Sequence, residues 1–358
     1  MRAWQLERLG GGLGLTDVPI PEARPGSVVV RMEAASLMSY MKDYAEGKLP
    51  IYHVPQGKFI PGVNGVGIIH AVGGDVWHLR VGQRVVLSSY FVAQENIQDP
   101  AQILIGITAQ GPVAERVQED WRNGTLAEYA LWPASSVTPA DELSSIDTAQ
   151  LAVSVRYVIP FGGLLRGRLA AGETIIISGA TGAYGAAAVF VALAMGAGRV
   201  VAVGRNTRAL EAVAAKAGPR VVPVAVTGEI KTDIERIKNA AHGNVQMAFD
   251  MVGAARDPNL TLAALRSLSR EGRLVLMGSM TVPLPIPYTE VMLNSWEIIG
   301  QFMYPRDSYR RLLDLVRLGL LDITSVQPRT FALKDLPRAM EAAANASNLE
   351  CVVVIPEM

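Results

Sequence analysis

The residues with the clearest chemical pattern form a glycine-containing turn between two apolar segments. Residues 175–177 are Ile-Ile-Ile, and residues 186–195 are again entirely apolar. This pattern predicts a strand, a tight turn and a helix whose first N–H groups have no partner within the helix. Such N–H groups and the helix dipole favour binding of a diphosphate. The predicted dinucleotide contacts are Ser178, Ala180, Thr181, Gly182, Ala183, Tyr184 and Gly185.

Two glycines of this turn have separate expected roles. Gly182 lets the backbone approach the phosphates, and Gly185 lets the helix pack close to the strand. The spacing is Ala-x-Gly-x-x-Gly, starting at Ala180. A glycine-rich turn without a ligand is the alternative, but the strand before it and the helix after it favour the dinucleotide.

The end of the next apolar strand is basic. A site for NAD normally has Asp or Glu about 20 residues after the glycines, where it binds the ribose hydroxyls. Residues 199–208 contain no acid and end in Gly204-Arg205-Asn206-Thr207-Arg208. Gly204 is expected to leave open the space of that carboxylate. Arg205, supported by Arg208, offers a planar charged group to a 2′-phosphate, so the segment predicts NADP(H). Two solvated arginines at a helix start are the alternative.

These residues need an α/β scaffold to position them. From residue 149 to residue 295, unbroken apolar strands alternate with helical segments, which predicts a doubly wound parallel sheet. Residues 1–148 contain short strands with frequent Gly and Pro, as in a partly open barrel. Residues 296–358 are expected to hold a strand at a dimer edge, a helix and a return to the first domain. Residues 88–123 show no clear period and are expected to be a functional or mobile loop.

Composition limits the possible partners. The chain has 358 residues, 50% of them hydrophobic and 18% charged, and its formal net charge is zero. That balance favours two globular domains and gives no basic excess for nucleic acid. One cysteine and no recognisable signal peptide predict a cytoplasmic protein. Residues 174–198 lack charge, but a strand and a helix explain them better than a membrane span.

Several segments, in this order along the chain, resemble the medium-chain dehydrogenase/reductases. They are residues 60–67, 81–85, 124–129, 175–185, 250–253 and 272–278. Within that superfamily the chain is similar to the zinc-free quinone oxidoreductase-like and alcohol dehydrogenase-like branch. The resemblance implies a Rossmann domain inserted into a GroES-like catalytic domain, and a homodimer. It also implies further cofactor contacts at Val252, Met277, Gly278, Ser279 and Met303.

The chain departs from the zinc-dependent members of this family. Those members carry a Cys after the second strand region, a His-Glu pair after Pro-Gly, and a Cys or His before the nucleotide domain. Here the corresponding segments are residues 36–40, Val63-Asn64 and residues 151–154, and none contains Cys or His. Because catalytic zinc needs about three protein ligands, we expect no metal.

Without a metal, hydrogen-bond donors must stabilise the negative charge that a carbonyl or enone develops when it accepts hydride. The candidate catalytic residues are Ser39, Tyr40, Tyr44, Asn64 and Arg156. Tyr52 lies in the same variable region as Tyr40 and Tyr44. Arg156 is expected to hold an oxyanion or a substrate carboxylate; a salt bridge at the domain junction is its alternative.

The sequence therefore predicts an NADPH-dependent oxidoreductase acting on an activated C=C or C=O bond, with an enone, quinone or other small carbonyl compound as substrate. One alternative is a metal-free alcohol dehydrogenase or carbonyl reductase on the same scaffold. An alternative of another class is an NADPH-binding protein with little turnover, since fold alone does not establish function.

Overall fold

The computed structural model describes residues 1–93 and 96–356, which divide into two compact units. Met1–Val155 and Gln327–Met358 form unit 1, and Arg156–Val326 form unit 2. The boundaries therefore lie after Val155 and Val326, whereas the sequence placed them after residues 148 and 295. The second one moves because residues 297–300 add a strand to the nucleotide-binding sheet, and the following helix stays with it.

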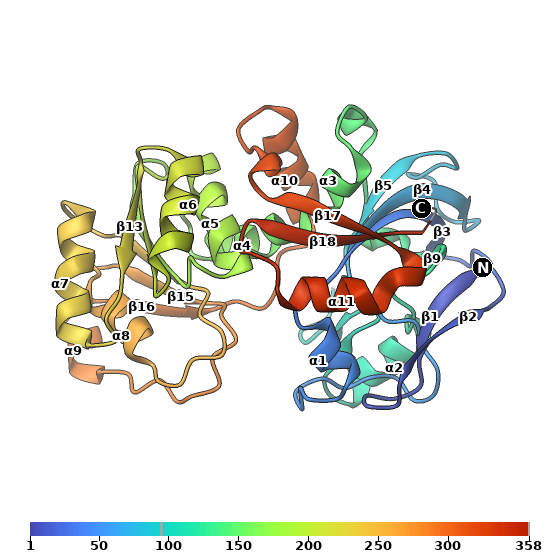
Figure 1. The fold of residues 1–358 in the computed structure, drawn as a ribbon, viewed down its shortest axis with the longest axis horizontal. Coiled ribbons are helices and arrows are strands. Elements are labelled where there is room, and N and C mark those ends of the chain that lie inside the picture. The colour runs from blue at the N-terminus through green and yellow to red at the C-terminus, as the bar shows by residue number, and fades with distance from the viewer. Residues whose placement is uncertain (94–95, 357–358) are drawn as a thin grey trace. The chain divides into compact units, whose positions relative to one another are not determined.

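Unit 1 is built on a sheet of seven strands in the order β10-β5-β4-β3-β18-β17, with β9 also paired to β3 (Figure 1). Its elements are β1 Arg2–Leu6, β2 Leu13–Asp17, β3 Ser27–Ser36, α1 Met41–Ala45, β4 Gly65–Val72, β5 Arg84–Leu87, β6 Tyr90–Val92, β7 Gln102–Leu104, β8 Thr108–Ala109, α2 Pro112–Asp120, β9 Tyr129–Pro133, β10 Val137–Pro139, α3 Thr148–Ala152, β17 Gln327–Ala332, α11 Leu336–Ala344 and β18 Glu350–Ile355.

The end of the chain completes this sheet, as the sequence predicted. Strand β18 pairs antiparallel with β3, with Val353 opposite Ser36, and parallel with β17. The predicted loop at 88–123 is instead ordered into β6, β7, β8 and α2, in the part that the structure describes. Three strands of two or three residues are too short to show a period in the sequence.

Unit 2 is the expected doubly wound sheet, with strand order β13-β12-β11-β14-β15-β16 and every pair parallel. Its elements are α4 Val155–Arg166, β11 Thr174–Ser178, α5 Ala183–Ala194, β12 Arg199–Gly204, α6 Thr207–Ala217, β13 Val221–Ala225, α7 Ile230–Ala241, β14 Met247–Asp250, α8 Asn259–Arg266, β15 Arg273–Leu276, α9 Tyr288–Asn294, β16 Glu297–Gly300 and α10 Ser308–Arg317.

Helices cover both faces of this sheet. Ile176 and Val201 pack in one core cluster with Ile237 of α7 and Ala264 of α8. Because side chains alternate along a strand, Ile177 faces the opposite side, where α5 and α6 lie (Figure 1). The strand order reverses between β11 and β14, and ligands of such sheets bind beyond the carboxyl ends of the strands at that point.

The apolar residues 174–198 form β11 and α5, as predicted. Another segment, Thr148–Arg166, has the length and composition to cross a membrane: it spans 19 residues, and 78% of its most apolar window is buried inside the structure. Such burial is typical of a core helix.

Candidate functional site

The glycine-containing turn joins β11 to α5 in unit 2. Gly182 is the residue before the helix, and α5 begins at Ala183, earlier than the sequence suggested. The turn is closed by a hydrogen bond from the Gly182 N–H to the Gly179 carbonyl, 2.9 Å long, and Ala180 N–H donates to Val203 on β12 at 3.0 Å. The first N–H groups of α5 therefore lie at the carboxyl end of the sheet, where a diphosphate would accept their hydrogen bonds.

Two glycines show that this turn has the close packing of a dinucleotide site. A Cβ at Gly185 would lie only 2.1 Å from the Gly179 carbonyl oxygen, so no side chain fits there. Gly179 has a φ of +76°, and a Cβ on it would lie 2.9 Å from the Met251 carbonyl group after β14. Helix, turn and neighbouring loop therefore pack as closely as the role expected for Gly185 requires.

Gly204 has a different role from the one expected. A Cβ at this position would lie 2.6 Å from Cγ2 of Thr181. The Thr181 side chain thus occupies part of the space that was expected to be open, and a side chain at 204 would force Thr181 to move.

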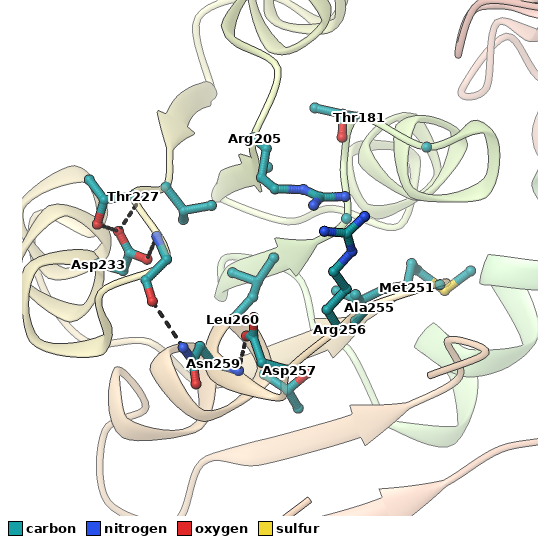
Figure 2. Close-up of a pocket in the computed structure, with 18 residues that line it drawn as sticks. Thr181, Arg205, Thr227, Asp233, Met251, Ala255, Arg256, Asp257, Asn259 and Leu260 are labelled. Carbon is teal, nitrogen blue, oxygen red and sulfur yellow. Dashed lines mark hydrogen bonds between the residues drawn. The ribbon is translucent and has the colours of Figure 1, made fainter. Parts of the chain in front are cut away.

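A pocket of about 500 Å³ lies beyond these strand ends (Figure 2). Its predicted lining residues are Thr181, Gly182, Gly204, Arg205 and Val252. A volume in this range is typical of small-molecule and cofactor sites. The lining segments follow β11, β12, β13 and β14, the region where the adenosine half of a dinucleotide lies in this fold.

Two neighbours of Arg205 do not line the pocket. Asn206 caps α6, with its Oδ1 accepting a hydrogen bond from Ala209 N–H at 3.1 Å. Arg208, in the first turn of α6, is exposed and lies outside the lining set. Arg205 is therefore the arginine of this segment that the structure brings into the pocket.

Polar residues that no sequence pattern indicated form one wall of the pocket. Asp233 on α7 is buried and accepts hydrogen bonds from Thr227 N–H at 2.7 Å and Gly228 N–H at 2.9 Å. Asn259 Nδ2 donates to the Gly228 carbonyl at 3.0 Å. These bonds fix the loop after β13. Figure 2 also shows Arg256 pointing into the pocket beside Arg205.

The cofactor residues implied by the family resemblance follow β14, β15 and β16. Gly278 packs against the loop after β14, since a Cβ on it would lie 2.2 Å from the Val252 carbonyl oxygen. Ser279 Oγ lies 2.9 Å from the Cβ position of Gly253, so both loops meet at one place. The Met277 sulfur instead packs 2.8 Å from the Cβ position of Gly163 on α4.

Three further predicted residues lie outside the pocket. The Met303 carbonyl oxygen lies 2.5 Å from the Cβ position of Gly162 on α4. Ser178 is fully buried. Tyr184, in the first turn of α5, has its ring 5.2 Å from the guanidinium carbon of Arg156.

Asp250 is the last residue of β14, and its carboxyl group lies next to the pocket-lining residues Val252 and Thr261. It is 3% exposed, and burial raises its pKa. Thr261 Oγ1 and Val252 N–H donate to it, the second at 2.7 Å, and both bonds oppose that rise. This carboxyl group thereby ties the loop after β14 to α8.

The predicted catalytic residues divide between the two units. Arg156 belongs to unit 2 and is 3% exposed. In unit 1, Asn64 is 2% exposed, and its Oδ1 accepts a hydrogen bond from Ser89 Oγ at 2.8 Å. Ser39 and Tyr40 remain half-buried at the start of α1.

The structure corrects the prediction for Tyr44. This side chain is completely buried, and its hydroxyl group donates to the Ile107 carbonyl at 2.9 Å. Burial raises its pKa. A hydroxyl group so enclosed cannot reach a substrate, so Tyr44 is a packing residue.

A tyrosine pair remains next to it. The rings of Tyr40 and Tyr52 are 6.1 Å apart, and both side chains are half-buried. Burial raises the pKa of Tyr52, while a hydrogen bond with Tyr40 opposes the rise. Tyr52 therefore stays protonated at neutral pH and can donate a hydrogen bond or a proton.

Comparison with known proteins identifies the family. Residues 24–142 match the alcohol dehydrogenase GroES-like domain, and residues 183–317 match the zinc-binding dehydrogenase family. An alcohol dehydrogenase of Moraxella sp. (strain TAE123) is 31% identical over 327 residues, which cover 90% of this chain and 91% of the relative. The chain belongs to the medium-chain dehydrogenase/reductase superfamily.

Solved structures of the superfamily share the fold over almost the whole chain. Alcohol dehydrogenase TADH from Thermus sp. ATN1 has a TM-score of 0.80 at 22% identity, with 99% of both chains covered. A putative zinc-binding dehydrogenase from Sinorhizobium meliloti 1021, bound to NADP, has a TM-score of 0.77 at 20% identity, again with 99% of both chains covered.

The zinc of this dehydrogenase superfamily does not fit the donors of this chain. Among the described residues, no group of three or more His, Cys, Asp or Glu side chains could hold a metal ion. At the segments that correspond to ligands in zinc-dependent members, Ser36 Oγ donates to the Asn64 carbonyl at 3.0 Å. Ser36 offers a hydroxyl group and Asn64 a side-chain amide that is bonded to Ser89, and neither is the thiolate or imidazole ligand that zinc prefers.

Proposed function

We propose that this member of the superfamily is an NADP(H)-dependent oxidoreductase that transfers hydride to an activated C=C or C=O bond without zinc. The observation that carries the choice of cofactor is Arg205, which lies in the pocket at the end of β12 and has no acid near it in residues 199–208. A carboxylate at this strand end would favour the free ribose hydroxyls of NAD(H). A guanidinium group favours a 2′-phosphate.

The chemistry follows from what the side chains can donate. A bound nicotinamide supplies the hydride. The chain must then stabilise the charge that develops on the substrate oxygen and deliver a proton. Tyr52 is a protonated donor, Tyr40 lies beside it with part of its surface exposed, and Ser39 precedes them on the same segment. We assign the donor role to this group, with Arg156 as a candidate for holding an anionic oxygen.

An enone or quinone is the proposed substrate class, because the chain resembles the zinc-free quinone oxidoreductase-like branch. Reduction of a simple carbonyl group is the second candidate. It is favoured by the relative from Moraxella, which is named an alcohol dehydrogenase. The product separates these candidates: a saturated ketone or a hydroquinone supports the first, and an alcohol supports the second.

The test is a screen of NADPH oxidation over enones, quinones, aldehydes and ketones with product identification, combined with metal analysis of the purified protein. We expect turnover of at least one activated compound with NADPH and less than stoichiometric zinc. Stoichiometric zinc would overturn the metal-free mechanism. Cofactor binding without turnover on any compound would instead favour a binding protein.

We also propose a homodimer, as the resemblance implies, and a cytoplasmic location, which the single cysteine favours. Strand β16 ends the sheet order and pairs only with β15 among the described strands, so its outer edge presents backbone groups that a second copy can bind. Helix α9 precedes this edge and has no buried residue, with Tyr288, Met292 and Leu293 all exposed.

A further inference from the structure

Two arginines from separate elements point into the same part of the pocket. Arg205 follows β12, and Arg256 belongs to the loop between β14 and α8. In Figure 2 their guanidinium groups point toward one another, next to Thr181. Neither group has an acidic partner within ion-pair distance among the described residues. Both side chains are exposed and free to turn toward a ligand.

The acids of this pocket are already engaged by the backbone. Asp233 accepts hydrogen bonds from the loop after β13, at 2.7 Å and 2.9 Å. Asp257 Oδ1 accepts one from Asn259 N–H at 3.0 Å. The negative charges therefore hold the wall of the pocket, and the two positive charges face its open space. Two cations that point at one another repel, and a dianion between them would remove that repulsion.

The loop that carries Arg256 is held in place before any ligand binds. Val252 N–H donates to Asp250 at one end of the loop, at 2.7 Å. At the other end, Asn259 Nδ2 donates to the Gly228 carbonyl, at 3.0 Å. Anchoring both ends of the loop lowers the entropy that is lost when its arginine binds an anion.

We infer that Arg256 is a specificity-determining residue that binds the 2′-phosphate of NADP(H) together with Arg205. This inference rests on the proposed function. The phosphate carries nearly two negative charges and three oxygens, so it can accept bonds from two guanidinium groups on different sides. One arginine comes from the strand end that usually discriminates between cofactors, and the other comes from the opposite wall of the pocket.

The test is calorimetry with adenosine 2′,5′-bisphosphate and with AMP, which lacks the 2′-phosphate. The proteins are wild type, Arg205→Gln, Arg256→Gln, the double variant, and Lys238→Gln as a control for the loss of one charge. Lys238 is exposed on α7 and lies outside the pocket. We expect Arg256→Gln to weaken the bisphosphate about tenfold or more, with AMP and the control unchanged. The fold-loss of bisphosphate affinity in the double variant should be smaller than the product of the fold-losses in the two single variants.

Three outcomes would overturn the inference. Unchanged bisphosphate affinity in Arg256→Gln would show that Arg205 acts alone, and the proposed function would stand. Equal losses for both ligands would assign Arg256 to the adenine or the 5′-phosphate. Wild-type protein that binds neither the bisphosphate nor NADPH would overturn the proposed function itself. Matching thermal unfolding of wild type and the single variants excludes a folding defect.

Discussion

Arg205 combines a position and a charge that a dinucleotide site can use. It follows β12 and lines the pocket, whereas Arg208 three residues later lies outside the lining set. A guanidinium group is a permanent cation in proteins. The preference for a 2′-phosphate should therefore persist across neutral pH, as long as the phosphate remains ionised.

The first residue-scale prediction is that Arg205→Gln weakens NADPH binding and spares NADH. A charge-assisted hydrogen bond contributes about 1.5–3 kcal/mol, so the Kd for NADPH should rise by roughly tenfold or more. Calorimetric titration of both cofactors measures this. Similar losses for NADPH and NADH would show that Arg205 does not recognise the 2′-phosphate.

Tyr44 gives a second prediction at this scale. Tyr44→Phe removes the hydroxyl group that donates to the Ile107 carbonyl. The free energy of unfolding should fall by about 1–2 kcal/mol, because a buried carbonyl group loses its partner. The rate of turnover per folded molecule should stay close to that of wild type, since the hydroxyl is enclosed. A large fall in kcat without a loss of stability would restore Tyr44 as a catalytic candidate.

The roles of some single residues could be predicted from the sequence, and those of others could not. Arg205 was predicted because it follows a strand at a known distance from the glycines. Arg256 was missed because it lies in a loop after β14, and no spacing rule indicates which way a loop turns. The roles expected for Gly204 and Tyr44 differ from their surroundings in the structure. Those surroundings depend on Thr181 and Ile107, which are distant in the chain.

At the scale of elements, β14 and α8 meet through Asp250. Burial raises the pKa of this carboxyl group above its ordinary value of 3.8. At pH values between 3.8 and this raised pKa, the folded protein therefore keeps a proton on Asp250 that the unfolded chain has already lost. Its contribution to stability is present at low pH and is lost as the pH rises toward the raised pKa.

Asp250→Asn should remove this dependence. We expect the free energy of unfolding of wild type to fall relative to Asp250→Asn as the pH rises from about 4, by ~1.4 kcal/mol for each unit of raised pKa. The difference should become constant above the folded-state pKa. Urea unfolding of both proteins between pH 4 and 8 measures it. A difference that does not vary with pH would mean that the carboxyl group is ionised throughout.

The elements of unit 2 were predicted well because each one is long or strongly periodic. The helical segments predicted between the strands of residues 149–295 include α7, Ile230–Ala241, whose apolar residues recur at helical spacing. Strands β6, β7 and β8 were missed because, among the described residues, they pair only with one another and have at most three residues. Such strands are determined by tertiary contacts and leave no pattern in the sequence.

At the scale of the whole molecule, the edge strand β16 and helix α9 predict the assembly. We expect sedimentation to give a mass twice that of the 38.3 kDa chain. Leu293→Glu should shift the protein toward monomer, because Leu293 is 60% exposed on α9 and a charge would be buried at the dimer interface. The exposed Leu318→Glu is the matched control and should sediment like wild type. A monomeric wild-type protein at micromolar concentration would contradict the proposed dimer.

Binding of the two reduced cofactors to wild-type protein tests the central claim most directly. In parallel calorimetric titrations at neutral pH, NADPH should bind with a Kd at least about tenfold lower than that of NADH. Equal affinities, or a preference for NADH, would contradict the assignment of the pocket beyond β12 to a 2′-phosphate.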